Sequence, residues 1–168
     1  MEILLFTIIM VVAVSFGAVI LRGAPFLPTK KMQVEAAFKL LNLKKGQTLV
    51  DLGSGSGTLL RAAAKRGIKA EGIEMNPILY TYSVITLHRY KDLVKLHYGD
   101  IWKWDLPKCD AVFIFGITSF MPKFKKKLQN EAKKKIKVVS FAFKLPGQKI
   151  KKEASGVYLY EFNKTSKM

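Results

Sequence analysis

The sequence predicts an α/β domain with a mainly parallel sheet, preceded by one apolar helix. Three observations lead to this fold class. Short apolar runs alternate with helical patterns along residues 31–143, an uncharged segment lies near the N-terminus, and a glycine cluster follows the first predicted strand. Strands that alternate with helices form a parallel sheet through right-handed crossovers.

The composition divides into an apolar part and a basic part. The 168 residues include 29 Lys and Arg against 12 Asp and Glu, a formal charge of +17, yet 49% of them are hydrophobic. Residues 3–21 contain no charged side chain, whereas residues 123–152 contain many lysines and a single acid, Glu131. The aliphatic and aromatic content excludes a disordered chain, and the lone Cys109 excludes a disulfide scaffold.

Residues 3–21 predict a transmembrane helix that anchors the chain. At 1.5 Å per residue this segment is about 28 Å long, which matches a hydrocarbon core of roughly 30 Å. The start of the chain lacks the basic residues of a secretory signal, so a retained anchor is favoured over a cleaved signal or a buried core helix. Positive charge follows the segment at Arg22, Lys30 and Lys31. This bias predicts a membrane location with the rest of the chain on the cytoplasmic side, or on the organellar matrix side.

The chain divides into three expected parts. The anchor covers residues 1–22, a connector with a helix covers 23–45, and one domain covers 46–168. Apolar residues at helical spacing predict the connector helix over 31–42, with Thr29 as its N-cap. The remaining elements are expected as strand 48–52, helix 58–66, strand 70–75, helix 77–90, strands 94–99 and 110–115, helix 122–135, strand 137–143 and an antiparallel hairpin over 149–162.

The glycine cluster predicts a ligand-binding loop. Glycines 53, 55 and 57 lie between a predicted strand and a predicted helix, where they permit a tight turn and close approach of backbone N–H groups. Asp51 stands two residues before the first glycine. An acid there would repel the pyrophosphate of a dinucleotide, but it suits the cationic amino-acid head of S-adenosylmethionine.

Two further acids lie where this ligand needs them. Glu74 ends the second predicted strand, where a carboxylate can accept both ribose hydroxyls. Asp100 ends the third and can accept from the adenine amino group, with Ile101 and Trp102 beside the ring. A solvated strand-end cap explains one such acid equally well, but three acids at consecutive strand ends favour a binding site.

These motifs resemble a family of membrane-anchored protein-lysine methyltransferases, whose members modify the c-subunit of ATP synthase and the adenine nucleotide translocase. The likeness covers nearly the whole chain and includes the order of anchor, short motif and core. The matching stretches are Pro25-Phe26-Leu27-Pro28-Thr29, Gln33-Val34, residues 50–57, Gly72-Ile73-Glu74-Met75-Asn76-Pro77, Gly99-Asp100-Ile101-Trp102-Lys103, Ser119, Pro122, Lys127-Leu128, Val138-Val139-Ser140, Phe143 and Pro146.

The resemblance implies a Rossmann-like class I methyltransferase sheet that binds S-adenosyl-L-methionine. The cofactor-binding residues that it implies are Asp51, Gly53, Ser54, Gly55, Gly57, Glu74, Met75, Asp100, Ile101 and Trp102. It also assigns a motif on the substrate side to Pro28, Thr29 and Gln33, and it implies an integral membrane protein as the substrate.

The acceptor lysine is expected at the carboxyl ends of the strands, near Phe115 to Ser119. Thr118 and Ser119 can orient an amine, although an N-cap of the helix that follows explains them better. A sulfonium methyl needs alignment rather than activation, so no general base is assigned. A methyltransferase for a lipid-soluble small molecule and a non-catalytic cofactor-binding membrane adaptor are the alternative functions.

The other candidate residues predict neither a metal site nor a nucleic-acid site. His88 and His97 lack nearby cysteine or carboxylate partners at metal-ligand spacing. The lysines of residues 123–152 lack the arginines and interleaved aromatics that nucleic-acid binding favours. Anionic lipid headgroups, or plain solvation, are the preferred explanation of this charge.

Overall fold

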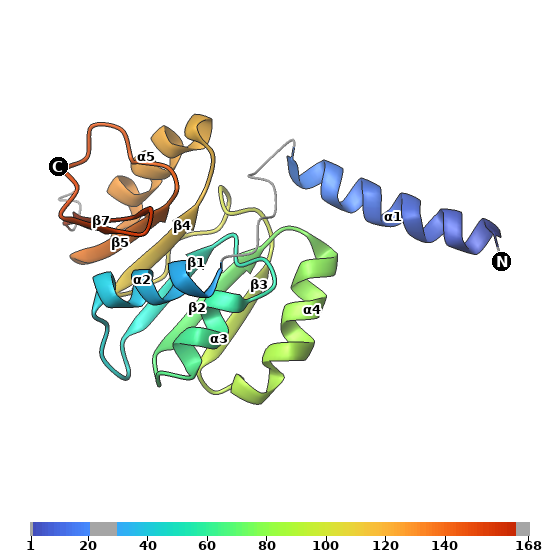
Figure 1. The fold of residues 1–168 in the computed structure, drawn as a ribbon, viewed down its shortest axis with the longest axis horizontal. Helices are drawn as coiled ribbons and strands as arrows, with labels where there is room; N and C mark the ends of the chain where they lie inside the picture. The colour runs from blue at the N-terminus through green and yellow to red at the C-terminus, as the bar shows by residue number, and fades with distance from the viewer. Residues whose placement is uncertain (1, 21–29, 164–168) are drawn as a thin grey trace.

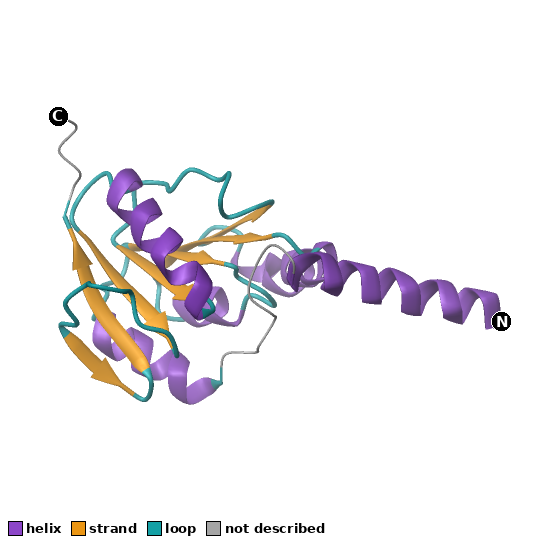
Figure 2. Cartoon of the chain, turned by 90° about the horizontal axis from the view of Figure 1, so that it is seen from above, coloured by secondary structure: helices purple, strands orange, loops and turns teal. Residues whose placement is uncertain are grey.

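The protein is an α/β domain with an apolar helix at its N-terminus. The computed structural model describes residues 2–20 and 30–163. One sheet runs through the domain with helices on both faces, and the N-terminal helix α1 projects away from it (Figures 1 and 2). The α/β class predicted from the sequence is confirmed.

Seven strands form one sheet in the order β3-β2-β1-β4-β5-β7-β6. The first five pair in parallel, and β7 pairs antiparallel with both β5 and β6. The strand bounds are β1 Thr48–Leu52, β2 Lys69–Glu74, β3 Val94–Tyr98, β4 Ala111–Phe115, β5 Ile136–Phe141, β6 Lys152–Ala154 and β7 Val157–Phe162.

The strand order places a crevice at the carboxyl edge of the sheet. The chain leaves β1 toward β2 and β3 on one side, and it returns to β4 and β5 on the other. The connections after β1 and β4 therefore diverge at neighbouring strands. This divergence is the position where open α/β sheets bind ligands.

The hydrophobic core consists of two clusters, in which helices pack against the sheet. Their bounds are α1 Glu2–Ile20, α2 Lys31–Leu41, α3 Thr58–Ala64, α4 Pro77–Leu87 and α5 Met121–Glu131, with short 3-10 turns η1 His88–Tyr90 and η2 Thr118–Phe120. Helices α2 and α3 bury their apolar side chains in one cluster, and α5 packs with the loop after β3 in the other. The β3–β4 connection, residues 99–110, contains no helix.

Helix α1 confirms that the uncharged N-terminal segment is helical, but its predicted passage through a membrane is not shown. Across residues 2–20 and 30–163, no helix reaches the combined length and hydropathy of a membrane span. Apolar side chains of α1 such as Ile3 and Phe6 are exposed.

Most element boundaries differ from the sequence prediction by one to four residues. Lys30, rather than Thr29, occupies the N-cap position of α2, and it makes no side-chain cap. Helix α5 ends at Glu131, four residues before the predicted end, because Ala132 is extended and the chain turns into β5. Lys134 in this turn pairs with Asp110, which precedes β4 and fixes where β5 begins.

Candidate active site

The glycine loop is held against the end of β2. The backbone N–H groups of Gly53 and Ser54 both donate to the carbonyl of Ile73, at 3.1 and 3.0 Å. Gly72 permits this contact, because a Cβ at that position would lie 2.7 Å from the Ser54 Cβ. The Oγ of Ser54 is buried without a hydrogen-bond partner among the described residues. The loop therefore presents a polar atom that a ligand can satisfy.

Gly57 ends the loop at a position that excludes a side chain. Its φ of +72° is left-handed, and a Cβ there would lie 2.5 Å from Leu87 Cδ1 and 3.2 Å from Ser83 Oγ. Both neighbours belong to α4, so the glycine allows α4 to approach the start of α3 closely.

We expect Gly57→Ala to destabilise the protein by about 2 to 4 kcal/mol, because backbone strain adds to overpacking. The matched control is Gly46→Ala, which shares a positive φ of +84° but has no atom within 4 Å of the new Cβ. Urea unfolding of both variants measures the difference. Equal losses in the two variants would show that the contact with α4 carries no energy.

Asp51 lies buried at the carboxyl end of β1, directly before the loop. Its side chain is 4% exposed and makes no hydrogen bond or ion pair within the described chain. Burial raises the pKa of Asp51 to about 8, and the Glu74 carboxylate adds to this rise. A buried carboxylate with no cation beside it is a favourable site for a positively charged ligand.

Glu74 joins the loop to the end of β2. Its Oε2 accepts from Gly55 N–H and its Oε1 accepts from Asn76 N–H, both at 2.7 Å. Burial raises the pKa of Glu74, and these backbone donors oppose that rise. A carboxylate offers about four acceptor sites, so Glu74 keeps acceptor capacity beyond its backbone donors. The carboxylate is therefore oriented by the backbone while it can still accept from a ligand.

Two residues that the sequence analysis did not assign complete this arrangement. The Asn76 side chain caps α4 by accepting from the N–H groups of Ile78 and Leu79. An Asn followed by Pro is a helix-start signal that could have revealed this cap. Ser83 Oγ donates to the carbonyl of Gly55 at 2.8 Å. No sequence signal marks Ser83, because only the packing of α4 brings it to the loop.

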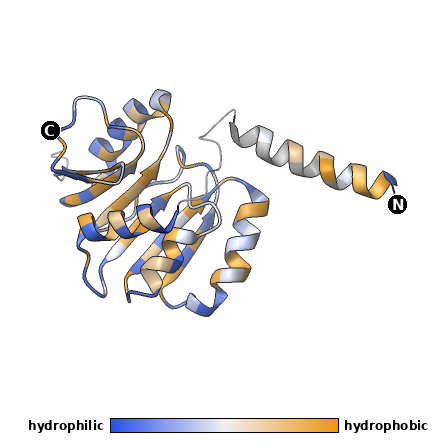
Figure 3. Ribbon diagram, in the orientation of Figure 1, coloured by the Kyte–Doolittle hydropathy of each residue, from blue (hydrophilic) through white to orange (hydrophobic). Residues whose placement is uncertain are grey.

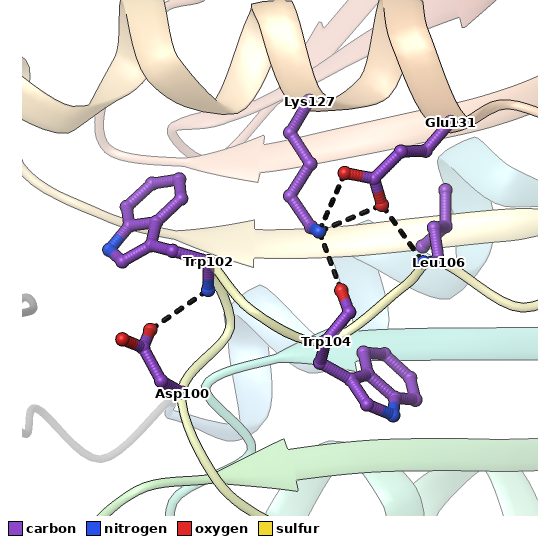
Figure 4. Close-up of polar contacts among 6 residues, drawn as sticks. All are labelled: Asp100, Trp102, Trp104, Leu106, Lys127 and Glu131. Atoms are coloured by element: carbon purple, nitrogen blue, oxygen red, sulfur yellow. Dashed lines mark hydrogen bonds and ion pairs between the residues drawn. The ribbon is translucent and has the colours of Figure 1, made fainter.

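Asp100 lies beside this site at the end of β3. Gly99 N–H donates to the carbonyl of Glu74 at 3.0 Å, which fixes the chain next to the end of β2. The Asp100 carboxylate accepts from Trp102 N–H at 2.8 Å (Figure 4). Ile101 and Trp102 are half-buried, and the Trp102 ring packs 4.7 Å from Phe124 of α5. The three acids thus lie at the carboxyl ends of adjacent strands, while Trp102 also contacts α5.

A buried ion pair fastens the loop after β3 to α5. Lys127 Nζ donates to the carbonyl of Trp104 at 2.6 Å and to both oxygens of Glu131, at 2.8 and 2.7 Å (Figure 4). Glu131 Oε2 also accepts from Leu106 N–H at 2.9 Å. Lys127 is buried, so it departs from the solvated lysines expected on this helix. Its spacing from Glu131 was visible in the sequence, but its burial was not.

The expected acceptor side lies at the carboxyl end of β4. Thr118 and Ser119 are exposed in η2, and the N-cap positions of η2 and α5 fall on Ile117 and Phe120 without a side-chain cap. The preferred explanation of these hydroxyls as a helix cap is therefore wrong. Nearby, the rings of Phe115 and Phe141 lie 5.5 Å apart at the ends of β4 and β5.

The substrate-side motif is described only at Gln33. Pro28 and Thr29 lie outside the described residues, whereas Gln33 is buried in α2 and its Oε1 has no hydrogen-bond partner in the described chain. Met75 is half-buried between Glu74 and the cap of α4. Among the described residues no three His, Cys, Asp or Glu side chains form a metal-binding group, and His97 lies 3.2 Å from Glu71.

Solved structures share this fold. An RNA methyltransferase from Salinibacter ruber, in complex with S-adenosyl-L-homocysteine, aligns with a TM-score of 0.74 and 25% identity over 84% of this chain and 96% of that one. A SAM-dependent methyltransferase from Geobacter sulfurreducens, also in complex with S-adenosyl-L-homocysteine, aligns with a TM-score of 0.58 and 20% identity, and covers 77% and 54% of the two chains.

The chain is also similar in sequence to proteins named as lysine N-methyltransferases. The lysine N-methyltransferase of the ATP synthase c-subunit from Rattus norvegicus is 38% identical over 73% of this chain and 57% of the relative. The enzyme of the same name from Caenorhabditis elegans is 31% identical over 80% and 75% of the two chains. The adenine nucleotide translocase lysine N-methyltransferase of Mus musculus is 35% identical over 73% and 54%.

The chain spans only about half to three fifths of the vertebrate relatives that carry the ATP synthase name, from 50% to 61% of their length. Residues 51–152, which include all three acids, match the family described as the ANTKMT methyltransferase domain. The family expected from the motifs is confirmed, and the chain belongs to the ANTKMT methyltransferase domain family.

Proposed function

We propose that this protein is an S-adenosylmethionine-dependent protein-lysine N-methyltransferase that acts on a membrane protein. The observation that carries the proposal is the buried Asp51 carboxylate at the glycine loop, next to Glu74. Family membership supports the reaction class, since the relatives are named as lysine N-methyltransferases.

The residues of the site fit the cofactor in charge and in hydrogen-bonding capacity. S-adenosylmethionine supplies an activated methyl group on a positively charged sulfur. Asp51 would hold the cationic amino-acid head, and this contact would return its raised pKa toward the ordinary range. Glu74 would accept from the ribose hydroxyls with its remaining lone pairs, and Asp100 would accept from the adenine amino group. The buried Ser54 Oγ offers one further polar contact.

The acceptor side would have to supply a neutral lysine amine. At pH 7, deprotonating a lysine of ordinary pKa costs about 4 to 5 kcal/mol. Desolvation beside Phe115 and Phe141, together with the positive charge on the cofactor sulfur, lowers that cost and makes a dedicated base unnecessary. We assign to the exposed hydroxyls of Thr118 and Ser119 the orientation of the amine, because neither caps a helix.

A membrane location is the second part of the proposal, and its support is the sequence. Residues 3–21 contain no charged side chain, and Arg22, Lys30 and Lys31 follow them. We propose that this segment tethers the chain in a single pass, with the methyltransferase domain on the cytoplasmic or matrix side. The names of the relatives point to integral membrane proteins as substrates.

Incubation of the full chain with radiolabelled S-adenosylmethionine and native membranes tests the reaction. We expect label in a protein band, at a lysine identified by mass spectrometry. Glu74→Gln should reduce cofactor affinity by about tenfold or more, because it removes a charged acceptor, and should reduce labelling with it. The exposed variant Glu35→Gln is the control.

Two other results would contradict the proposal. Label in the organic extract would identify a lipid-soluble small molecule as the acceptor. Cofactor binding without any transfer would identify a non-catalytic adaptor. Each result differs in where the label is found, so one set of samples separates the three functions.

A further inference from the structure

Helix α4 is an uncharged helix that buries little of its surface. Its 11 residues, Pro77–Leu87, include no charged side chain although the chain carries a formal charge of +17. Only Ser83 and Leu87 are buried, and Ser83 fixes the helix to the body through its bond to Gly55. The helix is therefore apolar on a side that residues 2–20 and 30–163 leave largely exposed.

Three of the four exposed large apolar side chains of α4 lie on one face, and the fourth, Val84, is 40% exposed and lies off that face. Ile78, Tyr82 and Ile85 follow each other at a spacing of four and three residues, which places them on one stripe. Their exposed fractions are 38%, 50% and 70%. Tyr98, on the neighbouring edge strand β3, is 59% exposed. We call Ile78, Tyr82 and Ile85 the α4 stripe.

Basic side chains border the stripe at its C-terminal end. Arg89, Lys91 and Lys95 are exposed in the segment from η1 to β3, and Asp92 is the acid among them. In Figure 3, hydrophobic and neutral colours cover most of α4, and hydrophilic colour begins where the helix ends. An apolar face with tyrosine and adjacent basic residues is typical of a helix that lies on an anionic membrane.

The position of α4 fits a lipid surface better than a protein partner. Helix α4 lies at the outer edge of the domain (Figure 1). The apolar helix α1 is in contact with α4. A fluid bilayer can adapt to the exposed surface of a helix, and the proposed tether would hold α4 close to the bilayer.

We infer that the α4 stripe rests on the surface of an anionic bilayer, with Ile78, Tyr82 and Ile85 among the headgroups and Arg89 and Lys91 near lipid phosphates. This inference rests on the proposed membrane tether and does not depend on methyl transfer. It has a consequence for the site, because Asn76 caps α4 and donates to Glu74. Membrane contact would place the cofactor end of the sheet beside the bilayer, where a membrane protein presents its lysines.

Lipid quenching tests this contact in the full chain. A fluorophore is attached to Ile85→Cys, and the protein is reconstituted into vesicles of phosphatidylcholine and phosphatidylserine that contain headgroup spin-labelled lipid. The matched control carries the fluorophore at Lys126→Cys, an exposed position on α5 across the sheet. The native Cys109 is buried and its pKa is raised to about 12, so it stays unlabelled at neutral pH. We expect strong quenching at position 85 and little at position 126.

Four results would contradict the inference, in whole or in part. Vesicle flotation without preferential quenching at position 85 would reject the α4 contact and leave the tether intact. Failure to float would reject both. Shielding of position 85 from aqueous iodide without lipid quenching would show that a protein surface covers the stripe. Arg89→Gln with Lys91→Gln should reduce the excess quenching in phosphatidylserine vesicles over phosphatidylcholine vesicles, and an unchanged excess would reject the anionic preference.

Discussion

Asp51→Asn should make the protein more stable at neutral pH while it weakens cofactor binding. The wild-type carboxylate is buried without a cation from the described residues beside it, so its ionised form is unfavourable in the folded state. An amide of the same shape carries no charge. We expect a gain in the free energy of unfolding on the order of 2 to 4 kcal/mol at pH 7, from 1.36 kcal/mol per pKa unit.

The raised pKa of Asp51 also determines how the stability of the wild-type protein should change with pH. The folded-state pKa of Asp51, about 8, lies above the ordinary value of 3.8, so the folded protein keeps a proton that the unfolded chain has lost. The free energy of unfolding should therefore fall as pH rises from about 4 to about 8 and level off above that. The Asp51→Asn variant should lack this decline. Urea unfolding across the pH range measures both curves, with the exposed Asp92→Asn as the control.

Asp51→Asn should weaken cofactor binding although it raises stability. Loss of the Asp51 charge should lower the affinity for S-adenosylmethionine by about 10- to 100-fold, the cost of one charged hydrogen bond. In the wild-type protein the affinity should increase toward pH 8, because the cation selects the ionised carboxylate. Calorimetry of both proteins measures these changes. Equal affinities would show that Asp51 does not hold the cofactor.

Lys127→Met should cause the second large effect, a loss of stability without a change in the apolar volume of α5. The substitution removes the donor shared by Trp104 and Glu131 and leaves the carboxylate partly buried. Breaking a buried ion pair from one side costs about 3 to 5 kcal/mol, and the partial exposure of Glu131 places this case near 2 to 4. Urea unfolding measures the loss.

The matched control for this variant is Lys126→Met. It removes the same charge from the neighbouring exposed position, so its effect should stay within about 0.5 kcal/mol. Cofactor affinity should fall severalfold in Lys127→Met only, because the ion pair fixes the loop that continues from Asp100 and Trp102. Equal behaviour of the two variants would mean that the ion pair neither stabilises the protein nor orders this loop.

Much of the candidate site could be predicted because its residues follow strand ends. Strand β1 is a short, mainly apolar run that leads into a glycine cluster, and this pattern identifies Asp51 and the loop. Glu74 and Asp100 follow from the same rule applied to β2 and β3. The hydrogen bonds of Glu74 could not be predicted, because they depend on how the loop folds back onto β2.

The contacts that position these residues depend on distant parts of the chain. Ser83 reaches Gly55 only because Gly57 lets α4 approach. Lys127 belongs to a run of lysines that is otherwise solvated, and pairwise spacing cannot show which one is buried. Thr118 and Ser119 were best explained as a helix cap, yet the chain places two other residues at those positions.

The sequence by itself determined the order of strands and helices, the glycine loop and the three acids, because periodicity and strand ends are local properties. Only the tertiary structure decided which charges are buried. Desolvation depends on everything packed around a group, and so Asp51 acquired its raised pKa, and Lys127 its burial and its bond to the Trp104 carbonyl, from neighbours far along the chain. The same holds for α4, because only the packing of the described residues shows that its apolar stripe is left exposed.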